Sequence, residues 1–303
     1  MSSEPKPISP DLKWKHFALY KNVKEALYSL PSFFKTETVI EGISATDIFT
    51  LNSALGATIE NQVVTTLNQM RSVWDPDEKY LLYSFTRQAQ TFPDVLLKKA
   101  SVTHSSEEDI ILGIELKGWY LIAKEGEPSF RFQVTPAACA IQDLIVVVPW
   151  ALNNIISGSP KVFAPYIESA RYAADYRNHH WSNIREAKTD IAINSPKGVK
   201  PYPKKTDLIS DKPVSDSGGN FGRFARTGIM DEYLGRTKQE LLCGIQAEHW
   251  LNFFKIFQDH KEKEVVAVEI DRLKRKVDEL GVKSGDEKYD HLRQILLRIE
   301  SLL

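Results

Sequence analysis

The sequence predicts a mixed α/β sandwich in which helices flank a central sheet. Apolar residues recur every four positions in residues 46–73, which is the spacing of an amphipathic helix. Residues 143–152, DLIVVVPWAL, are almost wholly apolar, as is typical of a strand covered on both faces. The order along the chain is a helix, three strands, a connection, a further strand and another helix, and this order favours packed layers of both kinds of element.

The N-terminal half predicts its elements in turn. Residues 1–12 are polar and rich in proline, so we expect a disordered tail. A helical pattern follows and is broken near Pro31. The long helix comes next, and the residues of its apolar stripe are Leu51, Leu55, Ile59, Val63 and Leu67. The three strands are expected at residues 78–86, at residues 93–99 and in the run IILGIELKGWYLIAKE, which ends at Glu125.

The C-terminal half changes character twice. A helix is expected at 163–181, then a long loop-rich insert at 186–236, then a second helix at 238–260. Residues 261–303 carry apolar residues at steps of three and four on both sides of a glycine-containing turn, which predicts an antiparallel helical hairpin. This hairpin packs either on the body or on a second copy of the chain. The main domain is expected to span 13–260.

Composition narrows the function classes. The 303 residues carry a net charge of −1, so any nucleic-acid partner needs a local basic surface. No apolar run approaches the roughly 20 residues that span a bilayer, and we expect no membrane partner. Cys139 and Cys243 are the only cysteines, which fits a reducing cytoplasm and excludes a disulfide framework.

The run GIELKGW poses the main chemical question of the sequence. Glu115 and Lys117 lie two positions apart within an otherwise apolar strand, so both side chains point to one face. Burying such charges costs several kcal/mol unless they pair or serve a ligand. The alternative is an edge strand on which the two form an ordinary solvent-exposed pair that contributes about 0–1 kcal/mol.

A short strand upstream supplies a third charge. Asp94 follows Pro93 at the head of the strand 93–99, and a turn separates it from Glu115 and Lys117. Pro93-Asp94 and Glu115-Leu116-Lys117 together resemble the PD-(D/E)xK nuclease superfamily, most of all its restriction-endonuclease-like members. The resemblance covers about residues 46–181, and it implies a restriction-endonuclease-like central mixed sheet flanked by helices.

The resemblance also implies roles for these residues. Asp94, Glu115 and the backbone carbonyl of Leu116 would bind a divalent metal, usually Mg²⁺, which takes hard oxygen ligands. Lys117 would position the attacking water and stabilise charge on the phosphate. Glu60, on the helix before the sheet, would complete the metal shell or hold a metal-bound water.

The insert is the expected DNA-contacting surface. Its cations can meet phosphates, and its glycines allow a close approach of the backbone to a duplex. Arginines there can instead read guanine edges in the major groove, and a solvated charged loop is the simpler alternative. The residues expected to bind DNA are Lys200, Lys204, Lys205, Asn220, Arg223, Arg226 and, just past the central strand, Lys124. Arg177, Asn178 and His180, at the end of the helix 163–181, are further candidates.

These expectations lead to one main function and two alternatives. The main one is a magnesium-dependent, sequence-specific endonuclease for double-stranded DNA, similar to type II restriction enzymes and acting as a homodimer on a two-fold symmetric site. The second is a repair or modification-dependent nuclease of the same fold. The third is a catalytically silent DNA-binding module.

Overall fold

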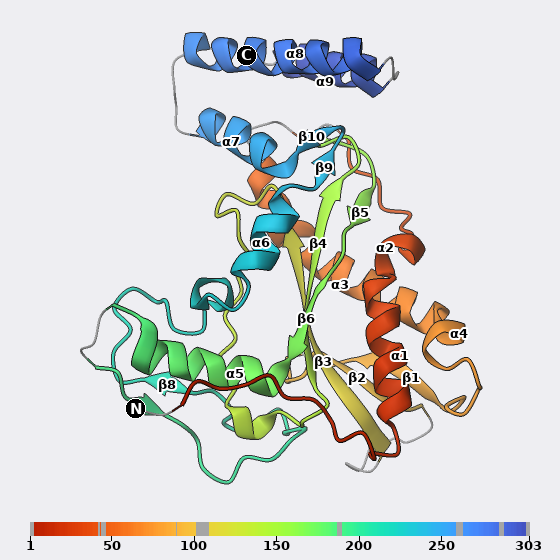
Figure 1. Cartoon of the computed structure of the whole chain (residues 1–303), viewed down its shortest axis with the longest axis vertical. Coiled ribbons are helices and arrows are strands. Elements are labelled where there is room, and N and C mark those ends of the chain that lie inside the picture. The colour runs from red at the N-terminus through yellow and green to blue at the C-terminus, as the bar shows by residue number, and fades with distance from the viewer. Residues whose placement is uncertain are drawn as a thin grey trace.

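The computed structural model describes residues 3–41, 43, 47–88, 90–100, 109–186, 190–258, 263–284 and 288–300. A curled mixed sheet lies at the centre, with α1 and α4 to one side and α5 and α6 to the other (Figure 1). The predicted mixed α/β architecture is therefore confirmed. None of the helices in these ranges combines the length and apolar character needed to cross a bilayer.

The central sheet follows the order β1-β2-β3-β4-β5, and β6 also pairs with β4. The pairings β1–β2, β2–β3, β4–β5 and β4–β6 are antiparallel, whereas β3 and β4 run parallel. The strands in the described part of the chain are β1 (Tyr83–Arg87), β2 (Val95–Lys99), β3 (Ile110–Tyr120), β4 (Leu144–Leu152), β5 (Pro160–Val162) and β6 (Tyr166–Ser169). Every residue of β4 is buried, as its apolar sequence predicts.

Helices supply the covering layers. They are α1 (Phe17–Tyr28), α2 (Leu30–Phe33), α3 (Leu51–Gln69), α4 (Arg71–Trp74), α5 (Ala170–His179), α6 (Asp231–Lys238), α7 (Ala247–Gln258), α8 (Lys263–Ser284) and α9 (Lys288–Glu300). Helix α3 contacts β3 and β1 and buries Ile59, Val63 and Leu67 of the predicted stripe. The described part of the N-terminal tail forms no helix or strand, and its Pro10 is buried.

The helix predicted at 163–181 starts later than expected, at Ala170. Tyr166–Ser169 instead form β6, because their backbone pairs with β4 over Leu144–Val147. The Ser169 side chain then accepts a hydrogen bond from the Tyr172 N–H and caps α5. The apolar pattern alone does not separate the buried strand from the helix that follows it.

The helix predicted at 238–260 is also wrong in its first part. A small hairpin of β9 (Leu241–Leu242) and β10 (Ile245–Gln246) separates α6 from α7. Its turn residues, Cys243 and Gly244, have φ angles of 50° and 84°, the left-handed conformation that two-residue hairpin turns require. The strand predicted at 78–86 begins only at Tyr83.

The C-terminal segment forms the predicted hairpin, in which α8 and α9 pack against each other beyond α7 (Figure 1). Ile270, Leu273 and Val277 of α8 and Leu292 and Leu296 of α9 are buried. Asp278 and Arg293 form an ion pair across the two helices, which is consistent with antiparallel packing. Helix α8 runs through Gly281 to Ser284, so the reversal comes later than the sequence predicts.

One glycine carries a packing constraint of its own. A Cβ at Gly113, within β3, would lie 2.2 Å from Cγ of Pro93. We therefore expect Gly113→Ala to lower the free energy of unfolding by about 1–3 kcal/mol through overpacking. Gly56→Ala, where a Cβ meets no atom within 4 Å, is the matched control and should stabilise helix α3 by up to about 1 kcal/mol. Urea denaturation measures both, and equal effects would contradict the packing argument.

Candidate active site

The candidate site lies where β2 begins beside β3. Val95 pairs with Ile114 in antiparallel register, which brings Asp94 alongside the middle of β3. The Asp94 backbone is held by Gln88, whose N–H donates to the Asp94 carbonyl at 2.6 Å and whose Nε2 donates to the Pro93 carbonyl at 2.9 Å. Pro93 rests on Gly113, so the chain around Asp94 is fixed from two sides.

Three charged side chains meet at this position. Nζ of Lys117 lies 2.8 Å from Oδ2 of Asp94 and 3.3 Å from Oε1 of Glu115. The side chains of Asp94, Glu115 and Lys117 are 22%, 12% and 24% exposed. Because the side chains of Glu115 and Lys117 are mostly buried, the alternative of a solvent-exposed pair is wrong.

Side-chain oxygens, among them one of Asp94, also accept hydrogen bonds from the backbone of β3. Because β2 begins only at Val95, β3 extends past it, and alternate N–H groups face side chains. The Leu116 N–H donates to Oδ2 of Asp94 at 3.2 Å, and the Gly118 N–H donates to Oε1 of Glu60 at 3.3 Å. One step further, the Tyr120 N–H donates to Oδ1 of Asn52 at 3.3 Å. Side chains thus complete the edge that a longer β2 would have covered.

Glu60 joins the cluster from helix α3, as the sequence predicts. Its second oxygen, Oε2, accepts a hydrogen bond from Nη2 of Arg87 at 2.8 Å. Nη1 of Arg87 donates to Oδ1 of Asn61, one position along α3. Burial raises the pKa of Glu60, against the attraction of Lys117. Arg87 was not predicted from the sequence, since the last residue of an edge strand carries no signal of what it contacts in the fold.

Burial and ion pairing compete within the cluster. Burial raises the pKa of Glu115 to about 7, although the Lys117 ammonium acts in the opposite direction. Burial also opposes the charge on Lys117, but attraction to Glu115 and Asp94 outweighs it and raises the pKa of that amine. The ammonium therefore stays charged, and Glu115 is the member of the pair that takes up a proton near neutral pH.

The residues that could hold a divalent metal ion are few. No group of three or more His, Cys, Asp or Glu side chains is arranged to hold a metal among the residues that the structure describes. Mg²⁺ commonly takes only one or two carboxylates and keeps several waters, which Asp94 and Glu115 match. The N–H and C=O of one strand residue point toward the same neighbouring strand. The Leu116 N–H points toward Asp94, so the Leu116 carbonyl does too. These two carboxylates and this carbonyl are the groups that would hold the ion.

A second buried carboxylate, missed by the sequence analysis, lies behind the site. Asp143 accepts hydrogen bonds from the Gly113 N–H at 2.7 Å, the Ala140 N–H at 2.8 Å and the Tyr202 hydroxyl at 3.1 Å. Burial raises its pKa to about 6, against these three hydrogen bonds. Tyr202 belongs to the insert, so the insert is tied to β3 through Asp143. An acidic residue directly before an apolar strand was the available signal.

The residues expected to bind DNA lie on three separate segments of the chain. Lys200, Lys204 and Lys205 are exposed in the segment 196–208 of the insert. A separate loop carries Asn220 and Arg226, which are exposed, and Arg223, which is half-buried. Lys124 is exposed past the end of β3.

The helix-end candidate Arg177 is wrong as a DNA contact. Its side chain is 1% exposed and forms a buried ion pair with Asp211. It also donates to the carbonyls of Phe132 and Val134. Asn178 donates to the same Asp211 carboxylate at 2.8 Å. These contacts join α5 to the insert. Asp211 is needed there, because a buried guanidinium without a partner would cost several kcal/mol.

Comparison with known proteins adds no relative. No protein-family model, curated protein or solved structure matches the chain.

The raised pKa of Glu115 predicts a pH-dependent stability. The folded state holds the Glu115 proton up to about pH 7, whereas the unfolded chain releases it near pH 4.5. Stability from this group is therefore present below pH 4.5 and is lost as pH rises to about 7, by on the order of 3 kcal/mol. Urea denaturation from pH 4.5 to 8 should show that Glu115→Gln removes this loss. Glu232→Gln, at a carboxylate 91% exposed, is the control, and identical profiles for all three proteins would refute the assignment.

Proposed function

We propose that the protein is a magnesium-dependent endonuclease that hydrolyses phosphodiester bonds in double-stranded DNA, similar to type II restriction enzymes. The observation that carries the proposal is the position of Lys117, whose ammonium lies between Asp94 and Glu115. Two carboxylates and a cation on one half-buried face are costly for a purely structural strand. They suit a reaction in which negative charge and a metal enter the site together.

Each side chain has a distinct task in this proposal. Mg²⁺, when bound, would lower the pKa of a water and neutralise charge that develops on the phosphate. Asp94 and Glu115 supply carboxylate oxygens as ligands for the ion. Glu115 must lose its proton before its carboxylate can bind the metal. Lys117 donates hydrogen bonds from an ammonium that stays charged, which orients the water and stabilises the phosphate. Glu60 accepts hydrogen bonds from the Gly118 N–H and from Arg87, which hold its carboxylate beside the two metal ligands. From there it would complete the metal shell or hold a metal-bound water.

The proposal includes sequence specificity and a homodimer. The described part of one chain carries one such cluster, so cutting both strands at a single site favours two copies related by a two-fold axis. The long insert offers exposed cations and turns from which bases can be read. Such an enzyme would serve in host defence beside a matching methyltransferase in the cytoplasm.

Cleavage of plasmid DNA tests the reaction. We expect the wild type to give discrete linear products with Mg²⁺ and none with EDTA. Lys117→Ala should lower the rate by about 100-fold or more, because it removes a charge that acts on the phosphate. Lys79→Ala, which removes an ammonium that is 71% exposed and paired with Asp77, should cut at the wild-type rate. Gel electrophoresis of timed samples measures all three.

The products distinguish the alternatives. A magnesium-dependent smear would favour a repair or non-specific nuclease of the same fold. Intact plasmid under every condition, methylated or not, together with a gel shift would favour a silent DNA-binding module and end the endonuclease proposal.

Magnesium should also stabilise the folded protein without any DNA. A ligand that binds only the folded state raises the melting temperature, and saturating Mg²⁺ should raise it by roughly 2–4 °C at pH 7.5. Asp94→Asn and Glu115→Gln should each abolish this shift, because each removes one carboxylate ligand. Glu232→Gln should keep it. Differential scanning calorimetry makes the measurement, and an undiminished shift in both site variants would place the ion elsewhere.

A further inference from the structure

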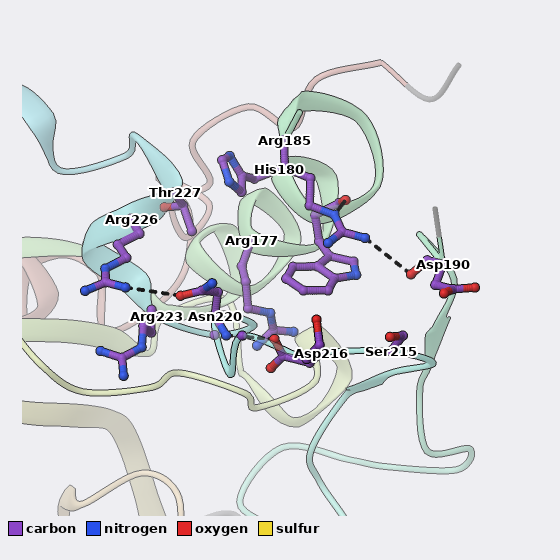
Figure 2. A pocket seen from close by; sticks show the side chains of 14 residues that line it. Arg177, His180, Arg185, Asp190, Ser215, Asp216, Asn220, Arg223, Arg226 and Thr227 are labelled. Carbon is purple, nitrogen blue, oxygen red and sulfur yellow. Dashed lines mark hydrogen bonds between the residues drawn. The ribbon is translucent and has the colours of Figure 1, made fainter. Parts of the chain in front are cut away.

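A cavity of about 540 Å³ lies in the insert, between the end of α5 and the loop 215–227. Arg177, His180 and Arg185 line it from the helical side, and Asn220, Arg223 and Arg226 line it from the loop (Figure 2). This volume is within the range of small-molecule sites, about 300–1,000 Å³. The cavity is therefore large enough for a ligand of nucleotide size.

The loop that forms one wall is ordered by its own hydrogen bonds. Asp216 accepts from the Asn220 N–H at 2.7 Å and from the Phe221 N–H at 3.1 Å. Gly219 and Gly222 have φ angles of 58° and 80°, and Phe221 is fully buried. These hydrogen bonds and the buried Phe221 give this wall of the cavity a defined backbone conformation.

A buried donor in this cavity lacks a partner. Trp181 is 5% exposed and lines the cavity, and its indole Nε1–H makes no hydrogen bond within the described part of the chain. Nδ1 of His180 is likewise buried without a partner there. An unsatisfied buried donor costs about 1–3 kcal/mol, so a ligand that accepts a hydrogen bond would be favoured here.

Charged groups of both signs line the cavity around that donor: the arginines Arg177, Arg185, Arg223 and Arg226 outnumber the carboxylates Asp190 and Asp216. Arg223 forms no ion pair with a carboxylate in the described ranges, and its Nε donates only to the Gly219 carbonyl. Arg226 is held by Glu127 and Asn220, and the guanidinium of Arg185 lies 3.7 Å from the centroid of the Trp181 ring. Guanidinium groups bind phosphate oxygens with two parallel hydrogen bonds. The arrangement favours an anion with several acceptor oxygens.

We propose that this cavity binds the phosphate group of a nucleotide, with Arg223 and the indole N–H of Trp181 as its donors. The phosphate belongs either to a free mononucleotide or to a nucleotide of a DNA strand. Such a site comprises none of the residues Asp94, Glu115, Lys117 and Glu60, and only its DNA form rests on the proposed function. Binding of a phosphate group to this site can be measured under conditions in which the protein does not cleave DNA.

Isothermal titration calorimetry of the full chain in EDTA tests the site. The probes are inorganic phosphate, dAMP and a short DNA duplex with and without a 5′-phosphate. Arg223→Ala should weaken binding by about tenfold or more, since a charge-assisted pair is lost. Trp181→Phe keeps the ring against Arg185 and Phe221 but removes the N–H, and should weaken binding by about threefold to tenfold. Arg236→Ala, on α6 and 72% exposed, should bind as the wild type does.

The probes separate the two sources of phosphate. Binding of dAMP that both variants weaken supports a free nucleotide, and binding of the duplex alone, weakened by both variants, supports a nucleotide of DNA. Absence of binding by every probe overturns the proposal. So does a loss in Arg223→Ala with no change in Trp181→Phe, because that pattern describes surface charge rather than the cavity. Since EDTA prevents metal-dependent cleavage, these results stand apart from the outcome of the plasmid experiment.

Discussion

The geometry of the candidate site depends on one backbone requirement, which is that β3 be hydrogen-bonded beyond the point where β2 starts. The N–H groups of Leu116, Gly118 and Tyr120 would face an empty edge there, and side-chain oxygens from Asp94, Glu60 and Asn52 accept them instead. Buried N–H groups need partners, so these oxygens stabilise the sheet as well as define the site. The carboxylates are fixed by the fold before any ligand arrives.

That arrangement explains how a half-buried strand tolerates its charges. The Lys117 ammonium neutralises part of the repulsion between Asp94 and Glu115, and Arg87 does the same for Glu60 from the outer strand β1. Desolvation nevertheless remains the largest influence on Glu115 and Glu60. The cluster is thus held together by geometry and remains electrostatically strained, a combination that active sites use to tune their acids and bases.

The candidate site could be predicted from the sequence because the residue patterns that mark it are local and periodic. Two charges at a spacing of two within an apolar strand predicted a shared face, and the Pro93-Asp94 pair predicted the neighbouring strand. Sequence reasoning failed where tertiary pairing decided the outcome, as for β6 within the expected helix 163–181. It also missed Arg87 and Asp143, since only the folded sheet shows which carboxylate and which N–H they meet. The restriction-endonuclease-like topology remains a prediction.

The anchoring of the insert has a consequence for protein engineering. Tyr202 and Asp211 reach from the insert into buried hydrogen bonds with Asp143 and Arg177. The insert therefore cannot be exchanged as a whole for another loop. Its removal would take Asp211 away and leave the buried guanidinium of Arg177 without a partner. Libraries aimed at new ligand preference are best confined to the exposed positions of the loop 215–226, with both anchors retained.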